Sequence, residues 1–167
     1  MEVGFFGMAL TLSFRPINIV CSSLYQVLYQ KVTDRVNENK SVLSLLGKFL
    51  LRIGSVTLLL FAVLYVLMPY IVSFLLGNEW IVVSDYIRIF LPWLFFVVLN
   101  TSLSFLPDVF CKQSIYLLFE IVYILLRLSA LLIGVRANSM HTALLLFSMI
   151  GALVLLVELC WFIYMVV

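Results

Sequence analysis

The sequence predicts an all-α integral membrane protein with about five transmembrane helices, and three observations lead to that fold class. Hydrophobic residues occupy 65% of the 167 positions and charged residues only 11%, whereas soluble globular domains hold roughly 45–50% and 25%. The mean hydropathy is +1.24, and no soluble fold of this size could bury so much apolar surface, so lipid is the expected solvent. The third observation is the length of the apolar runs.

A transmembrane helix needs about 20 mostly apolar residues to cross a hydrocarbon core of about 30 Å. Five stretches satisfy this requirement, at about residues 4–29, 49–76, 86–106, 115–133 and 142–166. A charged connection over residues 31–40 separates the first two, and amphipathic turns from Leu43 to Lys48 lead into the second. Residues 1–167 are therefore predicted to form a single transmembrane helical domain. Because the chain begins and ends inside apolar segments, we expect a fragment of a longer membrane protein.

Lysine and arginine in the short connections predict the orientation, since they collect on the cytoplasmic side of a membrane. One side carries six of them, namely Lys31, Arg35, Lys40, Lys48, Arg52 and Lys112. The opposite side carries only Arg88 and Arg136. We therefore predict that the N-terminus of this chain faces outward and that its C-terminus is cytoplasmic.

Arg15 is the most informative residue of the first span. It lies about eleven residues into the span, roughly 16 Å along a helix and so near the bilayer centre. A central arginine costs about 2.5–3.5 kcal/mol on insertion scales, so we expect it to face a bundle interior or a wet cavity. Snorkelling to an interface fits poorly at that depth. Asn18, Ser22 and Gln26 recur at every fourth position, close to the direction of Arg15, and are predicted to share its polar face.

The fourth span carries a second polar face, because Tyr116, Glu120, Tyr123 and Arg127 follow helical spacing. Glu158 lies in the fifth span, which runs antiparallel and brings it toward the same depth. Two interpretations are open. The charges could form an internal salt bridge that fixes helix packing, or they could form a cationic and aromatic cavity wall with a carboxylate able to take up a proton.

The sequence holds no constellation expected of an enzyme. His141 is the single histidine, which argues against a histidine relay or a metal cluster. The three cysteines lack metal-like spacing, and no glycine loop is present to cradle a phosphate. The net charge of +2 is too small to indicate nucleic acid without a clustered basic patch. We expect no catalysis, no cofactor, no metal and no nucleic-acid partner.

Five short segments occur in an order that points to one family. They are Gly4-Phe5-Phe6 with Ala9 and Arg15-Pro16, Ser23 to Tyr29, Leu76 to Trp80, Ile89 to Pro92, and Cys111-Lys112-Gln113. In order and topology the chain resembles the C-terminal portion of Wzx-type polysaccharide flippases, of the multidrug/oligosaccharidyl-lipid/polysaccharide exporter (MOP) superfamily. The most specific segment, Leu76 to Trp80, is similar to the family's "lfG.eW". The chain departs from the family pattern at Tyr29-Gln30, at Cys111 and in the loop 134–141.

The resemblance implies a two-lobed, twelve-helix bundle of MOP/MATE type, of which the five spans would be the last five. The N-terminal half of the transporter would then be a missing partner. The implied activity is flipping of undecaprenyl-diphosphate-linked oligosaccharide repeat units, for O-antigen or capsule, across the bacterial inner (cytoplasmic) membrane by alternating access. The implied site residues are Arg15 and Arg127 for the diphosphate, Asn18, Gln26, Tyr116 and Tyr123 for the sugars, and Glu120 and Glu158 for proton coupling.

Three alternatives remain open at this point. The same fold could export another substrate, such as a drug or a peptidoglycan lipid precursor. A membrane-embedded polysaccharide polymerase or glycosyltransferase would need acidic or histidine residues grouped at one membrane face, whereas Glu79, Asp85 and His141 fall in separate connections. A purely structural subunit would need no charge at mid-depth, and Arg15, Arg127 and Glu158 count against it.

Overall fold

The computed structural model of the chain describes residues 2–136 and 140–167. These residues are almost entirely helical, and no strand occurs among them. The elements in chain order are α1 (Glu2–Asn37), α2 (Leu43–Leu76), the 3-10 turn η1 (Asn78–Trp80), α3 (Ile81–Leu103), α4 (Leu106–Val109), α5 (Gln113–Arg136) and α6 (Met140–Val166). Five of the helical segments are long and apolar enough to cross a membrane, as the sequence predicts.

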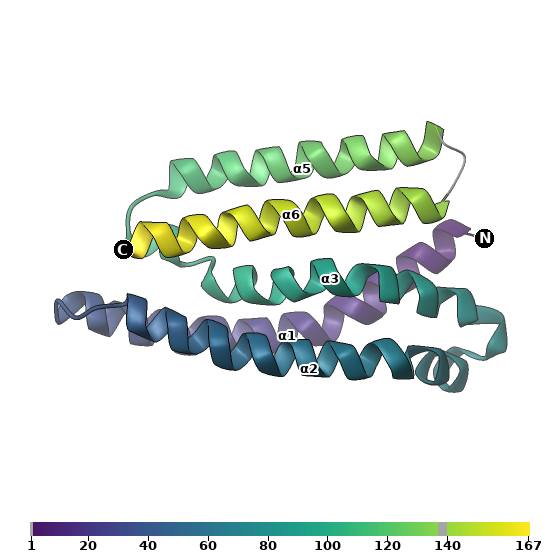
Figure 1. The fold of residues 1–167 in the computed structure, drawn as a ribbon, viewed down its shortest axis with the longest axis horizontal. Helices are drawn as coiled ribbons and strands as arrows, with labels where there is room; N and C mark the ends of the chain where they lie inside the picture. Colours follow the sequence, from purple (N-terminus) through teal and green to yellow (C-terminus); the bar gives the residue numbers. More distant parts are fainter. Residues whose placement is uncertain (1, 137–139) are drawn as a thin grey trace.

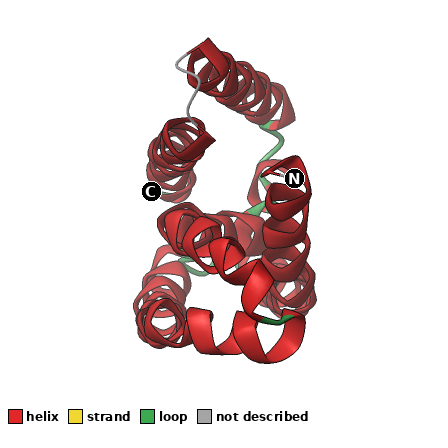
Figure 2. Cartoon of the chain, turned by 90° about the vertical axis from the view of Figure 1, so that its right-hand side faces the viewer, coloured by secondary structure: helices red, strands yellow, loops and turns green. Residues whose placement is uncertain are grey.

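The long helices run side by side along the longest axis of the molecule, and the two chain ends lie at opposite ends of it (Figure 1). Helix α3 occupies the centre, where it packs against α1, α2 and α6, while α5 packs mainly against α6. The end-on view shows the same helices with short connections between them (Figure 2). Most of α3 is buried and most of α2 and α5 is exposed, so lipid-facing surface belongs chiefly to the outer helices.

Two hydrogen bonds, one buried and one partly buried, tie the central helix to α6. Ser148 Oγ donates to the backbone oxygen of Ile89 at 2.6 Å, and Asn100 Nδ2 donates to that of Leu155 at 3.0 Å. Polar side chains bridging helices in this way are typical of membrane interiors, where no water competes for them. The polar residues of the third span therefore serve interhelical packing at Asn100.

The first span is longer than predicted. Helix α1 continues to Asn37, so most of the charged connection expected over residues 31–40 is helical. The segment lacks glycine and proline, and Val32 is fully buried in a cluster that also contains Leu46 of α2. Burial of this apolar side chain against α2 stabilises the helix past the membrane-length segment.

The connection from α2 to α3 is built around Gly77. Its φ of +91° suits glycine, because a Cβ would strain the backbone there. The Ser73 hydroxyl bonds to the Asn78 side chain across the turn, and Trp80 packs edge-on against Phe5 of α1 with ring centroids 5.1 Å apart. The run from Leu76 to Trp80 thus has a local structural role in ending one helix and anchoring the next.

The remaining span limits differ from those predicted by a few residues. Helix α3 begins at Ile81 and ends at Leu103, after which Pro107 stands in the first turn of α4. Proline fits there because the first turn of a helix needs no backbone donor. Helix α5 extends two or three residues beyond both predicted ends, whereas α6 begins two residues earlier than predicted and ends at Val166 as predicted. Residues 137–139 of the predicted loop 134–141 lie outside the described residues.

Candidate functional site

A polar pocket of about 290 Å³ opens between α3, α5 and α6, with one residue of α1 at its edge. Four of its lining residues come from the predicted polar face of α5, and Glu158 faces them from α6. The full lining is Phe14, Trp93, Val97, Asn100, Thr101, Ser104, Tyr116, Glu120, Tyr123, Arg127, Leu155 and Glu158. The structure therefore brings together five of the residues singled out from the sequence.

Arg127 is held in an aromatic cage. Its guanidinium carbon lies 4.0 Å from the ring centroid of Trp93, 3.7 Å from that of Phe147 and 4.8 Å from that of Tyr123. The cage joins three helices, since these rings belong to α3, α6 and α5. Arginine over an aromatic face gains about 2 kcal/mol when the pair is removed from water. The cage thus offsets part of the desolvation of a charge at membrane depth.

The Tyr123 hydroxyl fixes both the cage and the cation. Its oxygen accepts a hydrogen bond from Trp93 Nε1 at 2.8 Å and another from Arg127 Nη1 at 2.7 Å. One phenol oxygen therefore sets the position of the indole of α3 relative to the guanidinium of α5. A guanidinium held by aromatic rings and one hydrogen bond keeps its other N–H donors for a further acceptor.

Two buried polar atoms at the pocket have no hydrogen-bond partner among the described residues. They are the donor Nε of Arg127 and the acceptor Oδ1 of Asn100. Buried polar atoms are usually satisfied, so each such atom points to a ligand or to water. A donor and an acceptor lining one pocket suit a molecule that offers both hydrogen-bonding roles.

Glu158 is only 3% exposed and lines the pocket together with Glu120. Among the described residues the two ion pairs are Lys40–Glu38 and Arg88–Asp85. Arg127 is therefore not ion-paired with either carboxylate there. This geometry does not support an internal salt bridge in the pocket. The Arg127 guanidinium and the carboxylates of Glu120 and Glu158 line the same pocket without pairing with each other.

Arg15, Asn18 and Gln26 do not line this pocket. All three are exposed along α1, on the face that they share as predicted. Helix α1 meets α3 through a different face that carries Ser13 and Cys21. Ser13 precedes Arg15 by two positions, or about 200° around a helix, so Arg15 turns away from the described bundle. Grouping Arg15 with Arg127 in one cavity therefore does not hold within this chain.

Trp93, Phe147 and Asn100 complete the site and were not identified as binding residues from the sequence. Trp93 directly follows Pro92, and Phe147 lies in a mostly apolar helix. Neither residue belongs to a polar stripe. Their role depends on which faces of α3 and α6 meet α5, and helical spacing within one segment carries no information about that.

No family model, no curated protein and no solved structure matches this chain. The function is therefore inferred from the pocket and from the motifs of the sequence.

Proposed function

We propose that the chain is the C-terminal part of a Wzx-type flippase, which moves undecaprenyl-diphosphate-linked oligosaccharide repeat units across the bacterial cytoplasmic membrane. The observation that carries the proposal is an arginine at membrane depth, Arg127, that is caged by aromatic rings and not ion-paired within the described residues. A charge retained in that setting is typical of a binding or transport pathway.

The diphosphate is the part of the substrate that Arg127 would bind. Guanidinium groups bind phosphate oxygens through two parallel N–H bonds, and such charge-assisted bonds are about twice as strong as neutral ones. The rings of Trp93 and Phe147 hold the guanidinium in place, and its Nε–H has no partner among the described residues. A fixed cation with an unpaired donor favours an anionic group such as phosphate over a neutral drug.

The sugar units would contact the neighbouring side chains. Tyr116 and Trp93 offer aromatic faces, and Asn100 offers an amide oxygen that has no partner among the described residues. Glu120 and Glu158 supply carboxylates at membrane depth, where a proton could bind during the cycle. Coupling to a proton gradient is part of the proposal and rests on those two residues.

Arg15, Asn18 and Gln26 belong to the proposal in a different way. They form an exposed polar face on α1, and an arginine there is unfavourable against lipid. In a two-lobed transporter we expect this face to border the other helices of the bundle. Alternating access needs the two lobes to move against each other around a central site, so transport is expected of the complete protein.

Complementation in a flippase-deficient host tests the proposal. The complete gene product should restore surface polysaccharide, and Arg127→Ala should reduce it at least about tenfold at equal protein level, as expected for loss of a charged contact. Arg136→Ala is the control, because this exposed residue lies at the end of α5 outside the pocket. Intact export in Arg127→Ala at equal protein level would overturn the assignment.

The identity of the accumulated lipid separates the alternatives within transport. A strain that lacks the protein should accumulate diphosphate-linked oligosaccharide repeat units on the cytoplasmic leaflet. Accumulation of peptidoglycan precursor would identify the other lipid-linked substrate. A change only in drug sensitivity would assign drug export and contradict the proposal.

A further inference from the structure

A long groove separates α1 from α2 on the side of the molecule away from the polar pocket. Its wide end has a volume of about 780 Å³ and is lined by residues 24–31 of α1 and 45–56 of α2. Its narrow end, about 160 Å³, lies between residues 12–20 of α1, residues 57–68 of α2 and α3. The two parts follow each other along both helices, because Leu24 of the wide end lies one turn after Val20 of the narrow end, and Val56 of the wide end directly precedes Thr57 of the narrow end.

The wide end is cationic. Lys31 from α1 and Lys48 and Arg52 from α2 line it, and no acidic residue does. All three side chains are exposed, and neither ion pair of the described residues involves them. Three cations around one opening, none of them neutralised within the part of the chain that the structure describes, favour an anionic ligand.

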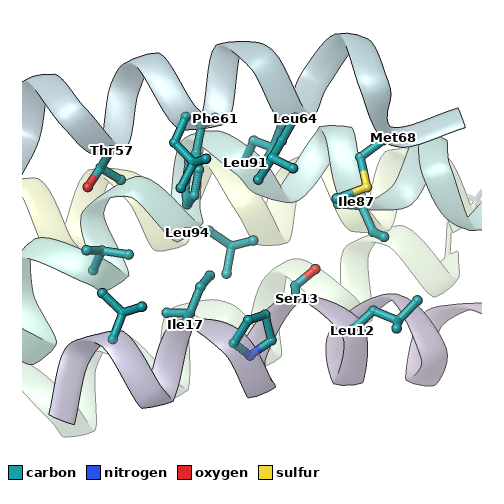
Figure 3. Close-up of a pocket in the computed structure, with 14 residues that line it drawn as sticks. Leu12, Ser13, Ile17, Thr57, Phe61, Leu64, Met68, Ile87, Leu91 and Leu94 are labelled. Atoms are coloured by element: carbon teal, nitrogen blue, oxygen red, sulfur yellow. The ribbon is translucent and has the colours of Figure 1, made fainter. Parts of the chain in front are cut away.

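The narrow end is apolar. Figure 3 shows side chains of α2, among them Phe61 and Leu64, facing side chains of α1 such as Ile17, with Leu94 of α3 behind them. The hydroxyl of Ser13 is already used, because it donates to the backbone oxygen of Ala9 at 2.7 Å. This slot therefore suits a hydrocarbon chain better than a polar group.

The dimensions agree with one leaflet of a membrane. Arg52 and Leu64 are twelve positions apart in α2, or about 18 Å along a helix. One leaflet contributes about 15 Å of hydrocarbon, half of the core. A ligand whose charge lies among the cations would thus reach the apolar slot with its tail. Charge at one end and an acyl-sized slot at the other are the two features of a phospholipid.

We propose that the groove between α1 and α2 binds one anionic glycerophospholipid, with its phosphate among Lys31, Lys48 and Arg52 and one acyl chain in the slot near Phe61. The charge distribution along the chain predicts that this end is cytoplasmic, where anionic lipids attract basic residues. The site is separate from the polar pocket, because it uses Leu91 and Leu94 of α3, on another face than Trp93. It does not depend on the proposed transport activity.

Charge removal tests the head end. The full chain is purified, mixed with vesicles of phosphatidylcholine alone or with one-fifth phosphatidylglycerol, and analysed by native mass spectrometry for retained lipid. The variant K31Q/K48Q/R52Q should retain at least about tenfold less phosphatidylglycerol, since basic residues near a membrane surface attract anionic lipid. Phosphatidylcholine retention should be low and unchanged. Equal phosphatidylglycerol retention by variant and parent would overturn the proposal.

A matched control removes the same charge elsewhere. K40Q/K112Q/R136Q also loses three positive charges, and none of those residues lines the groove. This control should retain phosphatidylglycerol as the parent does. A loss equal to that of the groove variant would show that only overall charge matters, and the proposal would fail.

Filling the slot tests the tail end without changing charge. Val20→Trp places a large ring at the α1 wall of the slot, and Val63→Trp makes the same change at an exposed position of α2 that lines neither end. Phosphatidylglycerol retention should fall at least fivefold in the first variant only.

Inorganic phosphate and an undecaprenyl diphosphate serve as competitors. Neither competitor should displace phosphatidylglycerol. Displacement of phosphatidylglycerol by inorganic phosphate, or tighter retention of the diphosphate lipid than of phosphatidylglycerol, would overturn the assignment of a glycerophospholipid as the ligand.

Discussion

Two arginines near mid-membrane occupy opposite situations in this molecule. Arg127 lies among Trp93, Tyr123 and Phe147 and donates to a phenol oxygen. Arg15 lies exposed on α1, and no hydrogen bond or ion pair involves it among the described residues. The same side chain at similar depth is thus stabilised from within the chain in one case and not in the other. Surroundings, not residue type, decide what each arginine contributes to the stability of this chain.

Truncation of Trp93 should have the largest effect. Trp93 is 2% exposed and packs against Phe14, Phe90, Phe147 and the Arg127 guanidinium. Trp93→Ala should lower the free energy of unfolding by about 3–5 kcal/mol, as for other buried aromatic truncations. Thermal unfolding in detergent measures this.

Trp161→Ala is the control for that substitution, because Trp161 is only partly buried. A loss as large as that of Trp93→Ala would show that the cage has no special role in stability.

Removal of the Tyr123 hydroxyl should have the next largest effect. Tyr123→Phe leaves Trp93 Nε1 and one Arg127 donor without their acceptor, and an unsatisfied buried donor costs about 1–3 kcal/mol. Tyr164→Phe removes a hydroxyl from a residue that is 77% exposed and should change stability little. Chemical denaturation of both variants, starting from the same detergent, compares them. If Tyr123→Phe were as stable as the parent, the Tyr123 hydroxyl would not be stabilising the cage around Arg127.

Adding a methyl group at Gly151, which packs against Trp93, should have an intermediate effect on stability. A Cβ at Gly151 would lie 2.9 Å from Trp93 Cδ1, so Gly151→Ala should destabilise the chain by about 1–2 kcal/mol through overpacking. Gly54→Ala is the matched control, since nothing lies within 4 Å of a Cβ there. It should be neutral or stabilise by up to about 1 kcal/mol through helix propensity. A loss of thermal stability in Gly151→Ala only would confirm the prediction, and an equal loss in both variants would contradict it.

Replacing each of the two arginines by lysine, which conserves the charge, should have the smallest effect. It also compares the two sites most directly. Lysine keeps the charge and loses the planar group that stacks on rings. Arg127→Lys should therefore destabilise the chain by about 1 kcal/mol, the typical cation–π contribution, whereas Arg15→Lys should leave stability unchanged. Thermal unfolding of the two variants, measured side by side with the parent, checks both expectations. A larger loss at Arg15 would reverse the comparison.

Helical spacing accounts for what could be predicted of the fold and of the site. The five apolar runs define the five long helices, and spacing places Tyr116, Glu120, Tyr123 and Arg127 on the one face of α5 that lines the pocket. Spacing also groups Arg15 with Asn18. It does not reveal which helix a face meets, because that depends on how the apolar surfaces of several helices pack together. The cage rings Trp93 and Phe147 were missed for that reason.

The length of α1 has a consequence for measuring membrane sidedness. Its 36 residues would span about 54 Å, well beyond a hydrocarbon core of about 30 Å. The surplus at the charged end, together with the start of α2, forms a helical stalk that ends in a turn at Asn39, whose φ is +52°. An epitope inserted at that turn would stand clear of the bilayer. Antibody staining of intact and permeabilised cells would then read the orientation of the whole chain from one position.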